Sequence, residues 1–408
     1  MEEEAQDKPR EYAPKVFLSR AELAGYKSIK DVKVDLHEGL NIIIGDNGSG
    51  KSNFLEFLYK AVSLDEKEFG KNITATLFFN KDNKHHYLLS FKEPQVLFQE
   101  QLDSLISFYD NVVFEIVDNG DNPIIVNTTD QVNSFFVQKD VMFSCQLIKH
   151  GVPVELPFIE KPFTFEFDRY SLNSEIRYLF EENIPYFLKS SFVEFELTRY
   201  QDSEKQEINE EFIIEQLSTI YEIKEILKQY SPIEDIKISD EDLYIHTNEK
   251  TNMVTVSNLF LLFKVSDQWL PFSSLSDGTK RLFYIIAEIA FSGRFRFFDK
   301  GFGINGRELN RIILLEEPEL GIHPHQLDKL MDFLREQSKH KQIIITTHSP
   351  QVLDILKKDE LDRIIIAKMG DNGTELRHLK EEEISKARNY MEKVGFLSDY
   401  WRLSDLDE

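Results

Sequence analysis

The stretch GDNGSGKS, residues 45–52, limits the possible folds of this chain more than any other. It follows the continuous apolar run LNIII, which predicts a buried strand, and it precedes apolar residues spaced as on one face of a helix. A glycine-rich loop of the form G-x4-G-K-[ST] in this setting directs backbone N–H groups at phosphate oxygens, and the helix N-terminus adds partial positive charge. The pattern therefore predicts a strand, a phosphate-binding loop and a helix in a domain that binds a nucleoside triphosphate.

The residue types within this loop predict individual roles. We expect Lys51 to bridge the terminal phosphates and the Ser52 hydroxyl to bind Mg²⁺. The expected nucleotide contacts of the loop are Asn47, Gly48, Ser49, Gly50, Lys51 and Ser52. The predicted cofactors are therefore ATP and Mg²⁺, and the alternative is a glycine-rich turn that fits the pattern by chance.

Composition narrows the choice of partners. A net charge of -24 repels nucleic acid and anionic membranes unless positive side chains gather on one face. Residues 280–311 are locally basic, so DNA contact there stays open beside the alternative of a solvated surface.

A polar leader at residues 1–14, without an apolar segment, is unlike a signal peptide, and the run LFLLF is too short to span a bilayer. The single cysteine, Cys145, fits a reducing compartment, so we expect a cytoplasmic protein with no membrane contact.

Hydrophobic patterning divides the chain into an ATPase lobe and a long insertion. Residues 15–62 carry the phosphate loop, and residues 265–370 alternate helices with strands, which is typical of a largely parallel sheet. Residues 63–264 form the insertion, β-rich over about 72–200 and helical over about 203–232. Residues 371–408 are expected to hold a hairpin end and a C-terminal helix. The predicted fold class is α/β, with a largely parallel core sheet, an antiparallel β subdomain and a helical insertion.

Two carboxylates and a histidine follow buried strands in the second half of the chain. Glu316 and Glu317 come at the end of the run RIILLEE, and His348 ends the run IIITTH. Ligands of open parallel sheets bind at the carboxyl ends of the strands, and adjacent carboxylates need a cation or a shared water. We expect Glu316 to bind the metal, Glu317 to orient the attacking water and His348 to contact the γ-phosphate. The alternatives are a surface glutamate pair and a structural histidine.

The stretch SSLSDGTKR, residues 273–281, places a Ser-x-Gly turn at the start of another helix. Apolar residues at 282, 285, 286 and 289 give this helix a buried face. Ser276 and Gly278 lie where the helix N-terminus carries partial positive charge. Taken alone, such a turn is an ordinary capped helix start.

In this order and spacing, the phosphate loop, LSDGTKR, LLEEPE, LGIHP and THS resemble the motifs of ABC-type ATPases. The phrases GYKSIKD and EEPELGIHPHQ are most similar to the soluble SMC, RecF and OLD-like branch, in particular to ATPases of prokaryotic phage-defence systems. The resemblance covers residues 15–62 and 265–370 and implies an SMC-head-like P-loop NTPase. It also implies that Ser276 and Gly278 contact the γ-phosphate held by a second copy of the chain.

Three positions depart from the pattern of that family. Glu316 stands where many relatives have Asp, Asp277 where many have Gly, and His323 where transporters have an acid, so the hydrolysis rate stays open. Gln201 is a weak candidate for the glutamine of the family's Q-loop.

The resemblance leaves two main roles open. OLD-like nucleases carry a Toprim domain after the ATPase, and only residues 370–408 follow RIIIAKM here, so we expect no nuclease in this chain. In the first role, the protein is the sensor and scaffold ATPase of a PARIS-type or Septu-type defence system. It forms an ATP-dependent dimer or higher homo-oligomer, senses a phage trigger protein and controls a separate effector, a nuclease. In the second role, it is a RecF-like repair ATPase that clamps DNA when ATP binds. A nucleotide-gated interaction module with negligible hydrolysis is a third possibility.

Overall fold

The structure, a computed structural model, divides the chain into two compact units. The first unit contains residues 1–147, 298–316 and 340–408, and the second contains residues 148–297 and 317–339. The residues that the structure describes are 16–64, 73–81, 85–92, 113–126, 129–139, 143–149, 163–168, 221, 223–239, 243–290 and 310–404.

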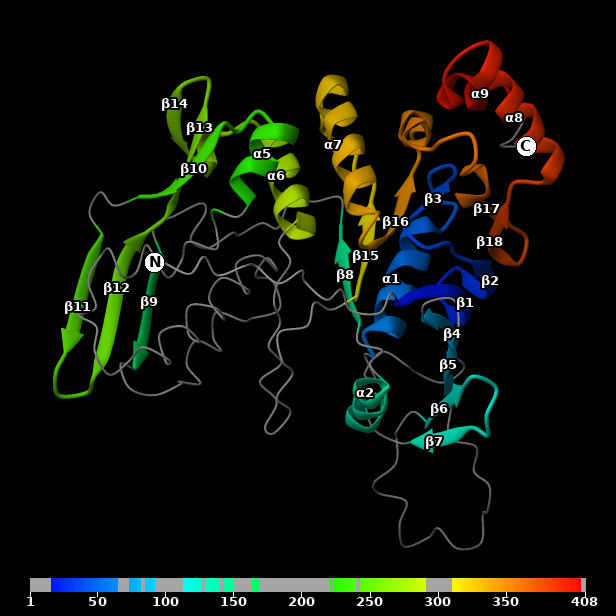
Figure 1. Ribbon diagram of the computed structural model, residues 1–408, viewed down its shortest axis with the longest axis horizontal. Coiled ribbons are helices and arrows are strands. Elements are labelled where there is room, and N and C mark those ends of the chain that lie inside the picture. Colours follow the sequence, from blue (N-terminus) through cyan, green and yellow to red (C-terminus); the bar gives the residue numbers. More distant parts are fainter. Residues whose placement is uncertain are drawn as a thin grey trace, which may run out of the picture. The chain divides into compact units, whose positions relative to one another are not determined.

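A six-stranded sheet with the order β18-β17-β3-β16-β15-β8 forms the centre of the first unit (Figure 1). Its strands are β3 (Leu40–Ile44), β8 (Phe143–Ile148), β15 (Asn310–Glu316), β16 (Gln342–Thr347), β17 (Ile364–Gly370) and β18 (Gly373–His378). The four strands β17, β3, β16 and β15 are parallel, and β18 pairs with β17 in antiparallel orientation. Helix α1 (Lys51–Val62) packs on β15 and β16, and both β3 and β16 are buried along their whole length. The predicted α/β fold class with a largely parallel core is confirmed.

A second six-stranded sheet of the first unit is antiparallel and has the order β2-β1-β4-β5-β6-β7. Its strands are β1 (Val16–Tyr26), β2 (Ile29–Asp35), β4 (Thr74–Lys81), β5 (His85–Lys92), β6 (Val113–Asp118) and β7 (Ile124–Val126). The turn after β6 contains Asn119 and Gly120, both with positive φ, as their sequence predicts for a hairpin.

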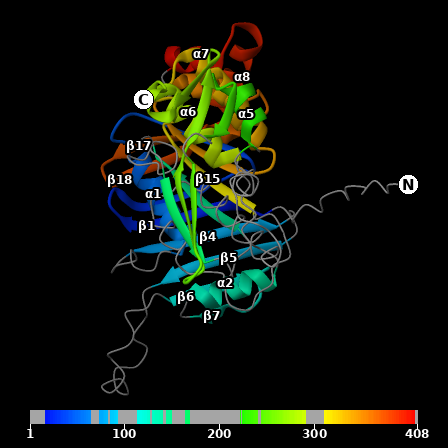
Figure 2. The same cartoon turned by 90° about the vertical axis from the view of Figure 1, so that its left-hand side faces the viewer.

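Helix α2 (Thr129–Gln138) lies along this antiparallel sheet, in a stretch that the sequence analysis assigned to strands (Figure 2). Val132 and Phe136 of α2 are buried, and the Phe136 ring meets the Phe79 ring at a centroid distance of 6.1 Å. These two positions are four residues apart and therefore share one helix face. The predicted β-rich stretch over about 72–200 therefore contains this short helix, whose pattern lies between stretches that alternate.

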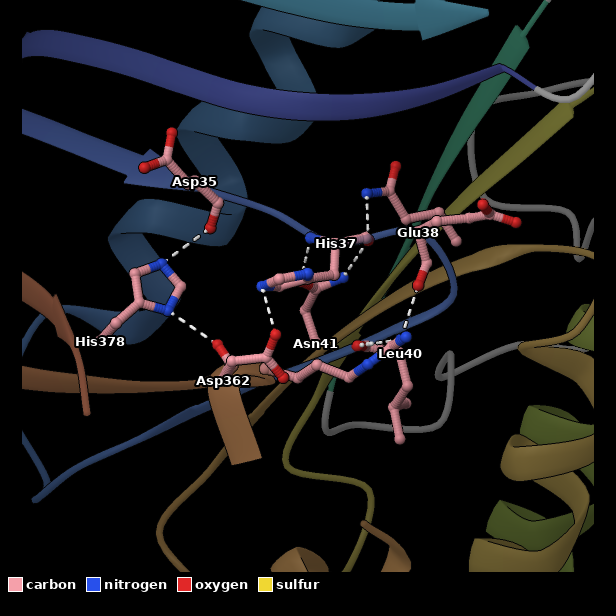
Figure 3. Close-up of polar contacts among 9 residues, drawn as sticks. Asp35, His37, Glu38, Leu40, Asn41, Asp362 and His378 are labelled. Carbon is pink, nitrogen blue, oxygen red and sulfur yellow. Dashed lines mark hydrogen bonds and ion pairs between the residues drawn. The ribbon is translucent and has the colours of Figure 1, made fainter. Parts of the chain in front are cut away.

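Side chains from residues 37–41 and from residues 362–363 fix the backbone at the start of β3 (Figure 3). Asn41 Oδ1 accepts a hydrogen bond from the His37 amide at 2.7 Å, and Asn41 Nδ2 donates to the His37 carbonyl at 2.8 Å. Arg363 donates to the Glu38 carbonyl oxygen at 2.6 Å. His37 Nε2 lies 3.5 Å from Asp362 Oδ2, yet burial lowers the pKa of His37 below its ordinary value. These contacts hold the strand that leads into residues 45–52.

The described residues of the second unit form two three-stranded antiparallel sheets and three α-helices. The strands are β9 (Phe163–Asp168), β10 (Asp235–Ile238), β11 (Tyr244–Asn248), β12 (Met253–Leu259), β13 (Leu261–Val265) and β14 (Gln268–Pro271), and the helices are α5 (Lys224–Tyr230), α6 (Asp277–Ala290) and α7 (Pro324–Gln337). The rings of Phe263, Phe272 and Phe283 pack against one another, with centroid distances of 4.9 to 5.6 Å. The predicted apolar face of α6 is buried at residues 282, 285, 286 and 289.

The end of the first unit contains short helices. The segment after Ser349 forms a short 3-10 helix, η5 (Pro350–Ile355). Helices α8 (Glu381–Lys393) and α9 (Leu397–Leu403) follow β18.

Cys145 is half-buried, and burial raises the pKa of its thiol.

Some sequence predictions concern residues outside the described ranges. These are the leader at 1–14, the candidate Gln201 and most of the helical insertion at 203–232. Within the described ranges, no helix combines the length and the apolar character that crossing a membrane requires.

Candidate nucleotide site

The loop between β3 and α1 depends on glycine at two positions. Gly48 and Gly50 have φ values of 83° and 92°, in the left-handed region that glycine adopts without a steric penalty. A Cβ atom on Gly50 would also lie 1.8 Å from Thr374 Oγ1. Substitution of Gly50 is therefore blocked by both backbone conformation and space, and α1 begins at the next residue, Lys51.

Gly45, the first residue of the loop, has no room for a side chain. Its N–H donates to the Thr347 carbonyl oxygen at 3.4 Å, which ties the loop to the end of β16. A Cβ atom on Gly45 would lie 2.1 Å from the carbonyl oxygen of Ala367 in β17. The loop thus leaves the sheet pressed between its two neighbouring strands.

The Lys51 ammonium is enclosed by the loop. Its Nζ donates to the carbonyl oxygens of Gly45 at 2.6 Å and of Asp46 at 2.8 Å, and Ser49 Oγ lies 3.5 Å away. Lys51 is only 5% exposed, whereas Ser52 is exposed. An ammonium group held inside a glycine-rich loop at the N-terminus of a helix is an arrangement that binds phosphate.

Two turns from other parts of the first unit fix the start of α1. Ser28 Oγ lies 2.8 Å from both Asn53 Nδ2 and Thr374 Oγ1, and the Thr374 N–H donates to the Ser28 carbonyl oxygen at 2.9 Å. Ser28 lies in the β1–β2 turn, and Thr374 lies in β18 next to the β17–β18 turn. The phosphate loop is therefore held from outside, which the sequence analysis did not predict because no local pattern links residues 28, 53 and 374.

Two further predicted residues lie at the same edge of the parallel sheet. Glu316 ends β15 and pairs with Thr346 of β16, and Thr346 pairs with Ile43 of β3. Since neighbouring strands are about 4.8 Å apart, Glu316 is roughly 10 Å across the sheet from the strand that enters the loop. His348 follows the end of β16 and is exposed. The topology thus brings Lys51, Glu316 and His348 to one edge.

The side chains at this edge fit a hydrated Mg²⁺ ion. The Ser52 hydroxyl and the Glu316 carboxylate are hard oxygen ligands of the type Mg²⁺ prefers, and the ion usually keeps several of its waters. Thr346 pairs with Glu316 in the neighbouring strand, so the two side chains lie on the same face of the sheet. Thr346 is fully buried, and its Oγ1 has no hydrogen-bond partner among the described residues. A metal-bound water would give that hydroxyl a partner. Elsewhere in the described ranges, no cluster of three or more His, Cys, Asp or Glu is arranged to hold a metal.

The unpartnered hydroxyl predicts an unusual stability effect. Because a buried polar group without a partner costs roughly 1–3 kcal/mol, Thr346→Val should raise the free energy of unfolding of the nucleotide-free protein by about 1 kcal/mol. The same variant should need more Mg²⁺ for ATP binding. Urea unfolding without nucleotide and Mg²⁺ titration of ATP binding measure the two effects.

The neighbouring threonine provides the matched control. Thr347 Oγ1 accepts a hydrogen bond from the Ser349 N–H at 2.9 Å, so Thr347→Val should lower the free energy of unfolding. Equal destabilisation by the two valine variants would contradict a special role for the Thr346 hydroxyl.

In the second unit, Ser276 caps the N-terminus of α6. Its carbonyl oxygen accepts the Lys280 N–H at 2.9 Å, and its Oγ accepts the Thr279 N–H at 3.3 Å and shares a hydrogen bond with Thr279 Oγ1 at 2.9 Å. Ser276 and Asp277 are exposed. The predicted Ser-x-Gly turn is therefore a capped helix start with its N-terminal end open to solvent.

Gly278 has a packing role within this unit. A Cβ atom at Gly278 would lie 2.8 Å from the carbonyl oxygen of Gly321, in the stretch LGIHP that precedes α7. The first turn of α6 is therefore pressed against that loop.

Glu317 has a backbone conformation that is rare for its residue type. Its φ is 43°, although it is not a glycine, and its carbonyl oxygen accepts a hydrogen bond from Arg281 of α6 at 2.6 Å. Arg281 is buried. Arg281 belongs to the locally basic region 280–311, and no sequence signal links it to Glu317, 36 residues further along the chain.

Comparisons with known proteins point to ATPases. Residues 161–354 match a family model described as "AAA domain, putative AbiEii toxin, Type IV TA system". The chain is 22% identical over 390 residues to an ATP/GTP phosphatase of Helicobacter pylori, which covers 90% of this chain and 93% of that protein. It is 31% identical over 101 residues to the Septu protein PtuA of Bacillus thuringiensis, covering 25% of each chain. It is also 36% identical over 44 residues to RecF of Streptococcus suis, covering 11% of this chain and 12% of that protein.

Solved SMC head domains also align with most of the chain. An SMC head from Thermotoga maritima is 11% identical, with a TM-score of 0.44, and the alignment covers 89% of this chain and 99% of that one. An SMC head with an extended coiled coil, bound to the C-terminal domain of ScpA from Pyrococcus furiosus, is 16% identical, with a TM-score of 0.47 and coverage of 93% and 100%.

The family match and the phosphatase relative support a P-loop ATPase of the AAA type. The family match spans the stretches LSDGTKR, LLEEPE and THS, and the phosphate loop at residues 45–52 lies before it in the chain. The alignment with this chain covers 93% of the phosphatase, but only 25% of PtuA and 12% of RecF.

Proposed function

We propose that the protein hydrolyses ATP and pairs with a second copy of itself through ATP bound between the two chains. The observation that carries this proposal is the loop of residues 45–52, which encloses the Lys51 ammonium at the same sheet edge as Glu316. In this account, Lys51 and the loop N–H groups bind the phosphates, and Ser52 and Glu316 hold Mg²⁺. The bound ion would neutralise charge on the β- and γ-phosphates.

Four further residues of this chain are proposed to act on the attacking water and the γ-phosphate. Glu317 orients and polarises the attacking water, and His348 donates a hydrogen bond to the γ-phosphate. Ser276 and Gly278, at the exposed N-terminus of α6, contact the γ-phosphate held by the second copy. The cap geometry of Ser276 supports this assignment, because it leaves the positive end of the helix dipole facing solvent.

We further propose that this ATPase is the switch of a prokaryotic anti-phage system and controls a separate effector protein, a nuclease. The similarity to PtuA and to the AbiEii-type family supports this role. The net charge of -24 also favours protein partners over nucleic acid.

The alternative, a RecF-like clamp on DNA, draws support from the similarity to RecF over 44 residues. It needs positive charge on the surface, and the region 280–311 was its candidate. Arg281 and Arg311 of that region are buried at 6% and 5% exposure, so neither contributes to a DNA-binding surface. Arg294, Arg296, Lys300 and Arg307 lie outside the described residues.

One experiment separates the two roles. The Glu317→Gln protein, trapped with ATP in its native host and purified, should retain a stoichiometric protein partner with nuclease activity. Duplex DNA binding in ATP, measured across salt concentrations, should be absent at physiological salt. Recovery of nucleic acid without a protein partner, together with DNA binding that weakens steeply as salt rises, would favour the RecF-like clamp over the anti-phage switch.

The pairing step predicts a specific effect at Ser276. Ser276→Asp retains a good helix cap but brings a carboxylate against the partner's γ-phosphate, so the protein should stay stable and bind ATP but lose at least tenfold in turnover. Specific activity of the wild type should rise with protein concentration, and that rise should vanish in the variant. Ser276→Ala is the control, since it loses about 1 kcal/mol of cap stability without adding a repulsive charge. Equal turnover for the aspartate variant and the wild type would count against contact in trans.

A further inference from the structure

Arg281 of α6 makes a close polar contact with the backbone of Glu317. The guanidinium Nη2 donates to the Glu317 carbonyl oxygen at 2.6 Å, and Arg281 is only 6% exposed. Both residues belong to the second unit. A hydrogen bond from a charged donor at low exposure is stronger than a neutral one, so this contact fixes the orientation of the Glu317 peptide group.

The conformation of Glu317 needs such support. A non-glycine residue in the left-handed region costs about 1–2 kcal/mol relative to its preferred conformations, and Glu317 has a φ of 43°. The next residue, Pro318, also biases Glu317 toward extended backbone. The Glu317 carbonyl accepts the Leu320 N–H at 3.2 Å in addition to Arg281. Strain of this kind persists where the surrounding contacts hold it, and it is common at functional sites.

The contact joins Glu317 to the helix that carries Ser276. Ser276 caps α6, and Arg281 lies five residues further on, about 7.5 Å along the helix axis. The first turn of α6 also packs tightly on the loop after Glu317, because a Cβ atom at Gly278 would lie 2.8 Å from the Gly321 carbonyl oxygen. A shift of the α6 N-terminus therefore acts on the Glu317 backbone through Arg281.

We propose that Arg281 is a positioning residue that sets the Glu317 backbone and so couples contact with the partner's ATP at Ser276 to hydrolysis of the chain's own ATP. The inference rests on the proposed roles of Ser276 and Glu317. It predicts that Arg281 affects turnover through Glu317 alone and leaves ATP binding in place.

A double-mutant cycle tests this coupling. Arg281→Gln should lower kcat at least tenfold and leave the KM for ATP within about twofold. In the Glu317→Gln background, measured by single-turnover hydrolysis, the same substitution should have no further effect. Arg281→Lys, which keeps a charged donor, should recover part of the lost kcat, and its effect should also vanish in the Glu317→Gln background.

Arg388→Gln is the control. Arg388 of α8 also donates to a backbone carbonyl, that of Lys358 at 3.0 Å, and it was assigned no part in the nucleotide site, so its loss should not lower kcat selectively. If Arg281→Gln does not fold, the double-mutant cycle is measured with Arg281→Lys in its place. We again expect that this substitution has no further effect on turnover in the Glu317→Gln background.

The outcomes separate the inference from the proposed function. Unchanged turnover in Glu317→Gln alone would overturn the proposed role of Glu317. The expected loss of turnover in Glu317→Gln would support that role. In that case, unchanged kcat in the Arg281 variants, or an equal loss of kcat with and without Glu317→Gln, would overturn the positioning role.

Discussion

The Lys51→Ala variant is expected to bind ATP at least 100-fold more weakly than the wild type and to lose ATP turnover. Lys51 places its ammonium within 2.8 Å of the Gly45 and Asp46 carbonyl oxygens, at the centre of the loop, and nearly all of its surface is buried. Removing a desolvated, charge-assisted contact to phosphate costs several kcal/mol, and about 1.4 kcal/mol corresponds to tenfold in affinity. Titration with a fluorescent ATP analogue and a phosphate-release assay measure both effects.

Lys60→Ala is the control for this substitution. Lys60 lies on the same helix, where its Nζ is 5.1 Å from the centre of the Tyr26 ring and 3.2 Å from the Tyr26 hydroxyl. Its loss should leave ATP affinity within a factor of about two, because it lies nine residues after Lys51, roughly 13.5 Å along the helix axis. Normal ATP binding by Lys51→Ala would remove the nucleotide site from this loop.

The Glu317→Gln variant is expected to keep ATP affinity and to lose turnover by a factor of about 100 to 1,000. The amide has the shape of the carboxylate but cannot accept the proton of the attacking water. Since the φ of 43° is a property of the backbone, the substitution should leave the contact with Arg281 in place. The measurement is kcat and KM from steady-state phosphate release, with ATP affinity taken from an independent titration.

Glu319→Gln is the matched control within the same motif, two residues further on, and its turnover should stay within about threefold of the wild type. Similar kcat values for Glu317→Gln and the wild type would exclude Glu317 as the residue that activates water.

Local sequence patterns predicted the part of the fold that is built from continuous segments. LNIII and QIIITT are buried parallel strands because most of their side chains are apolar, and the amides of Asn41 and Gln342 hydrogen-bond to backbone groups. The glycines of residues 45–52 were predictable from the same pattern, because the dihedrals of the loop admit few other residues. Since parallel strands end at a common edge, the positions of Glu316 and His348 followed from their places after strands.

The remaining features depend on contacts between distant segments. Arg281 and Glu317 are 36 residues apart, and the unpartnered hydroxyl of Thr346 is visible only when every neighbour is in place. From the sequence, a basic residue is expected to be a surface charge, whereas Arg281 in α6 and Arg311 in β15 are buried. The packing of Gly278 on Gly321 likewise gives this glycine a structural reason, in addition to the phosphate contact that the resemblance implied.

ATP is proposed to join two copies of this chain, and the mass of the Glu317→Gln protein in solution tests this pairing most directly. We predict that light scattering with Mg²⁺ and ATP gives at least twice the mass found without nucleotide, with one ATP retained per chain. We also predict that adding Ser276→Asp returns the mass to the nucleotide-free value while ATP stays bound. An unchanged mass at saturating ATP would contradict the account.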